Sequence, residues 1–336
     1  MARRRATSAW VKAFNRNLRS MARAATKMPR APRVARAKVA RGAAAGPGDW
    51  LPGLAMGPGG ARRFRLYRPP DLPPGERVPL LVMLHGCGQD SAGFAASTRM
   101  NALARRERFL VLYPEQDRLA NPQRCWNWYD TRSGRAQAEA SLILAAINQV
   151  CLLYPADPTR IALAGLSAGA GMAALLATRE PSRFQAVVMH SGVAPGMADS
   201  TATALAAMRG RRVSATGEAP SDPAAEPWPP LLVIQGGSDP VVSPSNGAAV
   251  AQLWAERLGA TAGTPRELRR GQRHPMTVTD FKHRSRALVS LVEVPRLGHA
   301  WSGGTASQPY SDARGPDASR MAWAFVLRQF RRTPGA

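Results

Sequence analysis

The sequence predicts an α/β protein with a mostly parallel sheet covered by helices on both faces. From residue 61 onward, short apolar runs alternate with segments of helical periodicity, as in successive strand–helix units. The main runs are apolar throughout rather than alternating, which is typical of strands buried on both faces. Hydrophobic residues make up 45% of the 336 residues, enough for a large core.

The individual elements follow from these patterns in chain order. We expect strands at 63–67, 79–84, 109–113, 161–166, 186–190, 231–235 and 288–294, and helices at 138–153, 168–179, 248–258 and 317–330. The first of these strands alternates in polarity, which indicates an edge strand. Asp317 or Ser319 can cap the last helix. Residues 208–230, rich in Arg, Ala, Glu and Pro, are expected to be a surface insertion.

The N-terminal region differs in composition from the rest of the chain. Residues 1–45 contain thirteen basic residues and no acidic one, which supplies about half of the net charge of +24. Within them Trp10, Phe14, Leu18 and Met21 recur at helical spacing with basic residues between them. This pattern predicts a basic amphipathic arm that could dock on an anionic or granule surface. A solvated, disordered arm is the alternative.

The boundaries of the main domain follow from composition. Residues 46–60 are rich in Gly and Pro and are expected to be a linker, and residues 61–331 form the predicted catalytic domain. No apolar run follows the basic residues, so we expect no secretory signal peptide. No stretch of 18 or more apolar residues indicates a transmembrane helix. The basic charge is weak evidence for a nucleic-acid partner, because half of it is confined to the arm.

The most informative motif is Gly165-Leu166-Ser167-Ala168-Gly169, between a predicted strand and a predicted helix. This context is typical of a nucleophile elbow, in which the flanking glycines permit a sharp turn that exposes the serine hydroxyl. The helix behind Ser167 would direct its positive end toward developing negative charge. The sequence therefore predicts Ser167 as a nucleophile. A simple Gly/Ser turn is the alternative.

A serine nucleophile needs a base and a carboxylate that orients the base. Asp239 and His299 each follow a predicted strand, which places both at the carboxyl edge of the sheet in the order Ser, Asp, His. We therefore predict Asp239 as the acid and His299 as the base. The competing residues are His190 for the base and Asp199 and Asp280 for the acid. His85 is expected to shape its loop, and the other two histidines, His274 and His283, to be solvated.

A Gly-rich loop, His85-Gly86-Cys87-Gly88-Gln89, follows an early apolar strand. A loop at this point can donate one backbone N–H to an oxyanion, while the residue after the nucleophile donates the second. The predicted donors are the backbone N–H groups of Cys87 and Ala168. A plain turn is the alternative.

The remaining candidates are cysteines and tryptophans. Cys87 and Cys125 lie in predicted loops near the same edge, where a disulfide would favour an oxidising compartment; reduced cysteines in a cytosolic protein are the alternative. Trp126, Trp128 and Trp301 could form a wall for an apolar acyl chain or simply fill the core. No Cys/His cluster has the spacing of a metal site, and we expect neither metal nor organic cofactor.

Together these motifs resemble the polyhydroxybutyrate depolymerase family of α/β-hydrolase esterases. The resemblance covers roughly residues 61–331 and rests on six motifs in order: Arg65-Leu66-Tyr67-Arg68-Pro69, His85-Gly86-Cys87-Gly88-Gln89, Cys125-Trp126-Asn127-Trp128, Gly165-Leu166-Ser167-Ala168-Gly169, Ser238-Asp239 and Gly298-His299-Ala300-Trp301. It implies the α/β-hydrolase fold, Ser167, Asp239 and His299 as the triad, and Cys87 at the oxyanion hole.

The resemblance also implies an activity and a location. The expected activity is serine carboxylester hydrolysis of short-chain polyhydroxyalkanoate or its oligomers. The family also contains feruloyl and acetylxylan esterases, which gives the alternative substrates. Its members are usually secreted, so an extracellular location is expected, with a cytoplasmic or granule-associated one as the alternative. A hypothesis from another class is a nucleic-acid-binding or surface-binding protein with an inactive hydrolase scaffold.

Overall fold

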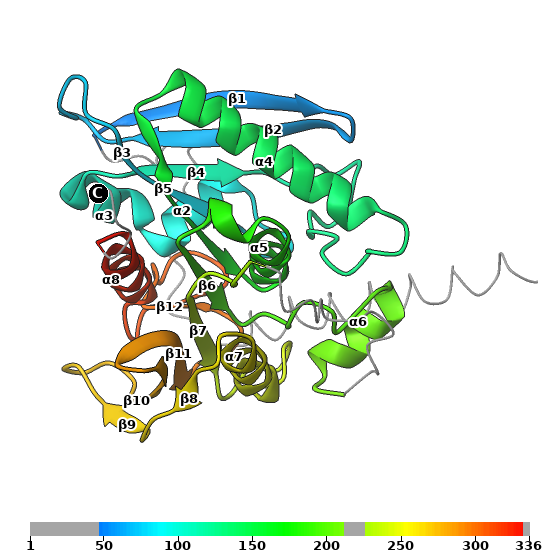
Figure 1. Cartoon of the computed structure of the whole chain (residues 1–336), viewed down its shortest axis with the longest axis vertical. Helices are drawn as coiled ribbons and strands as arrows, with labels where there is room; N and C mark the ends of the chain where they lie inside the picture. Colours follow the sequence, from blue (N-terminus) through cyan, green and yellow to red (C-terminus); the bar gives the residue numbers. More distant parts are fainter. Residues whose placement is uncertain (1–46, 212–225, 332–336) are drawn as a thin grey trace, which may run out of the picture. The chain divides into compact units, whose positions relative to one another are not determined.

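The fold is organised around one sheet in the order β1-β2-β4-β3-β5-β6-β7-β11-β10-β8, with β9 pairing β10 (Figure 1). The computed structural model describes residues 47–211 and 226–331, and this strand order refers to those residues. They belong to one compact unit. The predicted arm at 1–45 lies outside the described residues, as do 212–225 of the predicted insertion.

The centre of the sheet is parallel, as predicted. Its strands pair in the order β4, β3, β5, β6, β7, β11 with every neighbouring pair parallel. The carboxyl ends of these strands therefore lie at one edge of the sheet, and the loops that follow them are where ligands bind in folds of this kind. The strands are β3 (Val78–Leu84), β4 (Leu110–Pro114), β5 (Ala156–Leu166), β6 (Ala186–His190), β7 (Leu231–Gly236) and β11 (Arg286–Val294).

The linker predicted at 46–60 is wrong, because most of it forms strand β1 (Asp49–Gly57), antiparallel to β2 (Gly60–Arg68). β2 in turn pairs with β4, so it is not the edge strand that its alternation indicated. The composition misled because an edge strand tolerates Pro52. Gly53 is a packing residue: a Cβ there would lie 2.0 Å from the Phe64 ring.

The opposite side of the sheet also ends in antiparallel strands. β10 (Met276–His283) pairs with β11 on one side and with the short strands β8 (Thr261–Ala262) and β9 (Arg266–Leu268) on the other. The sequence did not predict β10, because this strand is largely polar and only partly buried.

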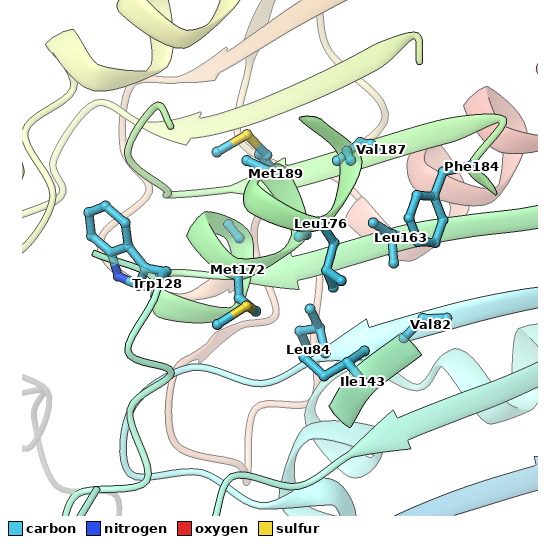
Figure 2. Packing of buried hydrophobic residues seen from close by; sticks show 14 of the residues in the cluster. Val82, Leu84, Trp128, Ile143, Leu163, Met172, Leu176, Phe184, Val187 and Met189 are labelled. Carbon is cyan, nitrogen blue, oxygen red and sulfur yellow. The ribbon is translucent and has the colours of Figure 1, made fainter. Parts of the chain in front are cut away.

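Helices cover both faces of the sheet, and β3 shows the division clearly. Leu80, Val82 and Leu84 belong to one core cluster, whereas the alternating Leu81 and Met83 belong to another. Figure 2 shows part of the first cluster, in which Ile143, Met172 and Leu176 approach Val82 and Leu84. The helices of the first face are α4 (Arg135–Leu153), α5 (Ala168–Arg179) and α7 (Ser245–Arg257); those of the second are α2 (Ser91–Thr98), α3 (Met100–Glu107) and α8 (Ala318–Phe330).

Most predicted elements lie where the patterns put them. α5 and β6 have the predicted bounds, and α8 begins after Asp317, whose side chain accepts a hydrogen bond from the Arg320 N–H. The short helices α2, α3 and α6 (Thr201–Met208) were not predicted. Within the described residues, α4 is the helix that is long and apolar enough to cross a membrane. It packs on the sheet through Ile143, Ile147 and Val150, as a core helix does.

Candidate active site

Ser167 lies at the turn between β5 and α5, in a backbone conformation that few L-residues adopt. Its φ of 57° and ψ of −119° fall outside the common regions. The backbone holds it there, because the Ser167 N–H donates to the His190 carbonyl at 2.8 Å. A Cβ on Gly165 would lie 2.3 Å from the Gly169 backbone, and a Cβ on Gly169 would lie 2.1 Å from the Leu84 carbonyl oxygen. Both glycines of the motif are thus required by close backbone approach.

Asp239 and His299 meet at the carboxyl edge of the sheet. His299 Nδ1 donates to Asp239 Oδ2 at 2.8 Å, and the Asp239 side chain is fully buried while that of His299 is 10% exposed. Asp239 Oδ1 also accepts the N–H groups of Val241 and Val242, at 2.8 and 2.9 Å. Burial by itself would raise the pKa of Asp239, but the hydrogen bond and charge of His299 and these two N–H groups lower it below its usual value. Asp239 is therefore ionised at neutral pH.

His190 is not placed to act as the base, the role for which it was the alternative to His299. Its ring is fully buried, stacks on Trp301 with centroids 5.1 Å apart, and accepts the Ser302 N–H at Nε2 at 3.1 Å. Burial and the nearby His299 lower the pKa of His190 to about 3, so the ring is neutral. With Nε2 as acceptor, the proton lies on Nδ1, which is 3.2 Å from Ser191 Oγ. His190 is thus committed to holding the segment after His299.

The loop at residues 85–89, named the oxyanion loop for its predicted role, lies beside Ser167. A Cβ on Gly86 would be 3.6 Å from the Ser167 Cβ. The loop is braced internally, since the Gly86 N–H donates to Gln89 Oε1 at 2.9 Å and His85 Nδ1 donates to the Gly86 carbonyl at 2.9 Å. Cys87 follows Gly86 directly, as Ala168 follows Ser167. The two predicted oxyanion donors therefore belong to adjoining backbone segments.

A disulfide joins this loop to the segment at 125–128. Cys87 and Cys125 are bonded, with an S–S distance of 2.10 Å, while Cys151 is a free, half-buried thiol whose pKa is raised by burial. The structure therefore has the disulfide rather than the reduced pair.

A buried polar cluster, made of Arg62, Gln116, Asn127 and Glu139, supports the same two segments. Gln116 Nε2 donates to Glu139 Oε1 at 2.7 Å, and Glu139 Oε2 accepts the Asn127 N–H at 2.9 Å. Arg62 Nη1 donates to Gln116 Oε1, and the Gln116 N–H donates to His85 Nε2 at 3.1 Å. The cluster is therefore tied to the oxyanion loop through His85.

The sequence reasoning missed this cluster, although one signal was available. Glu139 shares the buried face of α4 with Ala136, Ala140 and Ile143. A carboxylate on such a face requires partners in the core, because burying an unpaired charge is costly. Helical spacing could therefore have marked Glu139, though not the residues that meet it.

The predicted tryptophan wall is wrong for this structure. Trp126 and Trp301 have no exposed surface, and Trp128 is 8% exposed. Trp126 Nε1 donates to the His85 carbonyl at 3.1 Å, and Trp301 Nε1 donates to Ser319 Oγ at 3.1 Å. Trp128 packs on α5, where a Cβ on Gly171 would lie 2.8 Å from its indole. All three indoles are therefore packed inside the protein. Trp126 and Trp301 also find a hydrogen-bond acceptor for the indole N–H, as buried tryptophans usually do.

Tyr310 lies near the oxyanion loop, and the sequence reasoning did not identify it. It has a φ of 55°, which is a rare conformation for a bulky side chain. Its hydroxyl lies 3.7 Å from the position that a Cβ on Gly88 would take, and its carbonyl accepts the Trp301 N–H at 2.8 Å. Burial raises the pKa of Tyr310. The Tyr310 hydroxyl therefore lies near Gly88, while its backbone carbonyl holds the chain segment that follows His299.

The rival residues have partners of their own. Asp199 pairs with Arg132 at 3.3 Å and Asp280 with Arg266 at 2.5 Å. His283 Nδ1 donates to the Gly259 carbonyl at 2.8 Å. His274 is buried, with Nε2 3.5 Å from Asp312 Oδ2, so the expectation that it is solvated is wrong. Across residues 47–211 and 226–331, no group of three or more His, Cys, Asp or Glu could hold a metal ion.

The fold and the site together define an α/β-hydrolase, with a serine on the elbow after β5, a carboxylate after β7 and a histidine after β11. The chain belongs to the esterase PHB depolymerase family, whose family model matches residues 63–266. The match ends before His299, which the fold alone brings to Asp239.

Several characterised relatives support this assignment. The chain is 32% identical over 197 residues to poly(3-hydroxyalkanoate) depolymerase C of Paucimonas lemoignei, covering 56% of this chain and 46% of the relative. It is 32% identical over 117 residues to feruloyl esterase B of Neurospora crassa, covering 34% of this chain and 39% of the relative. The chain thus spans less than half the length of these two relatives. A third, acetylxylan esterase A of Emericella nidulans, is 24% identical over 226 residues, covering 61% of this chain and 70% of the relative.

Solved structures show the same fold at low identity. The acetyl xylan esterase from Aspergillus awamori matches with a TM-score of 0.61 and 18% identity, covering 75% of this chain and 94% of that one. A thermostable esterase matches with a TM-score of 0.51 and 17% identity, covering 83% of this chain and 63% of that one.

Proposed function

We propose that this protein is a serine carboxylester hydrolase acting on short-chain polyhydroxyalkanoate, such as poly(3-hydroxybutyrate), or its oligomers. The observation that carries the proposal is the buried Asp239–His299 hydrogen bond, at the same sheet edge as the strained Ser167 elbow. Similarity to depolymerases of Paucimonas lemoignei and Ralstonia pickettii supports the polyester substrate.

The first half of the reaction forms an acyl-enzyme. His299 directs its Nδ1–H to Asp239, which leaves Nε2 free to take the Ser167 proton. Ser167 Oγ then attacks the ester carbonyl, and the carbonyl oxygen gains the negative charge. The Cys87 and Ala168 N–H groups stabilise this oxyanion, a contribution of about 10²–10³ in rate for each donor of this kind.

The second half releases the acid. The His299 imidazolium protonates the alkoxide of the leaving alcohol as the C–O bond breaks. His299 then takes a proton from water, which attacks the acyl-enzyme carbonyl, and Ser167 leaves with that proton. The ionised Asp239 stabilises the imidazolium in both halves, and its lowered pKa keeps it charged throughout.

The proposed setting is extracellular. The Cys87–Cys125 disulfide supports it, because disulfides persist in oxidising compartments. The basic residues 1–45 are proposed to dock the enzyme on a granule or anionic surface. Deleting them should lower polymer turnover and leave turnover of a soluble ester intact, and equal effects on both substrates would contradict this role.

The decisive experiment is a substrate panel measured with wild type and Ser167→Ala. The panel contains p-nitrophenyl butyrate, amorphous poly(3-hydroxybutyrate), methyl ferulate and acetylated xylan. We expect turnover of the first two, with Ser167→Ala reduced by about 10⁴-fold or more. Full activity in Ser167→Ala would exclude the mechanism.

A feruloyl or acetylxylan esterase is the second candidate. The similarity to feruloyl esterase B and acetylxylan esterase A supports it, and the latter relative is covered over 70% of its length. Faster hydrolysis of methyl ferulate or acetylated xylan than of the hydroxybutyrate polymer in the same panel would favour this candidate.

A further inference from the structure

A cavity of about 310 Å³ lies at the start of α8, away from the nucleophile elbow. Four arginines line it, and they come from three separate segments: Arg99 between α2 and α3, Arg270 and Arg273 from the turn before β10, and Arg320 from the first turn of α8. The one acidic residue in its lining is Asp317. The cavity therefore carries a strong excess of positive charge.

Backbone carbonyls hold two of these guanidinium groups in place. Arg99 Nη2 donates to the Gly303 carbonyl at 2.5 Å, and Arg273 Nη1 donates to the Gly315 carbonyl at 2.6 Å. A guanidinium has five N–H donors, so each retains several for a ligand. Because these side chains are already positioned, binding through them costs less conformational entropy than ordering free arginines.

The carboxylate of Asp317 compensates only part of this charge. It lies 3.5 Å from Arg320 and 3.9 Å from Arg99. Within the described residues, Arg270 and Arg273 have no carboxylate within 4.0 Å, the limit for an ion pair. Two of the four guanidinium groups therefore lack an acidic partner.

A second cavity, of about 170 Å³, shows that arginine-lined hollows in this protein are not all alike. Arg63, Arg118 and Arg124 line it together with Glu115 and Asp117. Arg124 also pairs with Asp90 at 3.0 Å. Its charges are close to balanced, whereas those around Arg270 are not.

We propose that the cavity between Arg99, Arg270, Arg273 and Arg320 binds a phosphate dianion, either free or as the phosphate group of a small phosphomonoester. Planar guanidinium groups bind phosphate oxygens in bidentate geometry. A carboxylate carries one negative charge rather than two, so it is attracted less strongly to a site with this excess of positive charge. The cavity is open to solvent, so we expect a Kd of about 1 mM. This site is independent of the proposed esterase activity.

The test is isothermal titration calorimetry of the full-length protein with inorganic phosphate, glycerol 3-phosphate and acetate at constant ionic strength. Wild type should bind phosphate saturably and acetate much more weakly. Tighter binding of glycerol 3-phosphate would assign the site to phosphomonoesters, and equal or weaker binding would assign it to inorganic phosphate. Acetate binding as tight as that of phosphate would overturn the dianion proposal.

Two variants of opposite charge change make the test specific. Arg270→Gln should weaken phosphate binding about fivefold, because it removes one charge-assisted hydrogen-bonding group. Asp317→Asn should strengthen it about threefold, because it removes a repelling carboxylate and retains a side chain that can cap α8. Each is expected to keep the wild-type rate on p-nitrophenyl butyrate, which reports that the variant is folded.

Arg179→Gln is the matched control, since Arg179 is exposed in the last turn of α5 and lines neither cavity. It makes the same change in net charge as Arg270→Gln and should leave the phosphate Kd unchanged. Equal weakening in Arg179→Gln and Arg270→Gln, no change in Arg270→Gln, or weaker binding in Asp317→Asn would each overturn the proposal.

Discussion

His190 Nε2 accepts the backbone N–H of Ser302 at 3.1 Å, and the His190 carbonyl accepts the N–H of Ser167 at 2.8 Å. One residue at the end of β6 thus contacts both the nucleophile elbow and the segment that follows His299. Ser167 and His299, the predicted nucleophile and base, come from distant parts of the sequence, and His190 contacts the segments that carry both.

Replacing His190 should therefore impair catalysis without removing a reacting group. In His190→Phe the Ser302 N–H loses its acceptor, and we expect kcat on p-nitrophenyl butyrate to fall about tenfold or more with little change in KM. His190→Gln keeps an acceptor and should recover much of the loss. Wild-type kcat in His190→Phe, or an equal loss in both variants, would contradict this positioning role.

The same residue should make stability depend on pH. The pKa of His190 is about 3 in the folded protein against 6.5 in the unfolded chain, so between these values only the unfolded chain binds the extra proton. The free energy of unfolding should therefore fall by about 1.4 kcal/mol for each pH unit of acidification across this window. Urea unfolding at about pH 6 and about pH 5 measures this, and His190→Gln should lack that part of the slope. Parallel pH dependence in the two proteins would contradict the assignment.

The disulfide should matter for both activity and stability. Replacing Cys87 and Cys125 by serine together releases the oxyanion loop from the segment at 125–128, and the two cysteines are 38 residues apart in sequence. We expect kcat to fall about tenfold or more and the unfolding free energy to fall by about 2–4 kcal/mol. Kinetics and urea unfolding measure the two effects. Cys151→Ser is the control, since Cys151 is outside the disulfide, and the double variant should not behave like it.

Tyr310→Phe isolates the hydroxyl near the oxyanion loop. The ring keeps its packing, so the fold should persist, while a polar group near Gly88 is lost. We propose that this hydroxyl hydrogen-bonds the substrate, so kcat/KM on hydroxybutyrate oligomers should fall about fivefold, the usual effect of losing one hydrogen bond. Thermal unfolding checks that stability is retained. Unchanged kcat/KM on both oligomers and p-nitrophenyl butyrate would show that the hydroxyl contacts no substrate.

Local patterns were sufficient to predict the parallel sheet and the elbow. The bounds of α5 and β6 could be read from sequence because each is an apolar segment with clear ends. Ser167, Asp239 and His299 each follow a strand of that sheet, so topology brings their chain positions to one edge. The catalytic roles of these three residues remain predictions, and Ser167→Ala tests the first of them.

Features that depend on tertiary contacts were beyond sequence reasoning. The exposure of an indole cannot be read from its neighbours in sequence, which is why the wall of Trp126, Trp128 and Trp301 was wrong. Strand β1 was not predicted because Pro52 and Gly53 suggest a loop. The strand accommodates Pro52 because it lies at the edge of the sheet, and it needs glycine at position 53 because the Phe64 ring packs there. The partners of Glu139 come from other elements, which no local pattern could identify.

The buried polar cluster that contacts the oxyanion loop constrains how this protein can be redesigned. Arg62, Gln116 and Glu139 are each at most 3% exposed, and Gln116 hydrogen-bonds to both of the others. Changing one alone would leave a charge or an amide without its partner, whereas exchanging the set together would avoid that penalty. Directed evolution that proceeds by single substitutions should therefore change the exposed residues around the predicted active site readily and leave this buried cluster unchanged.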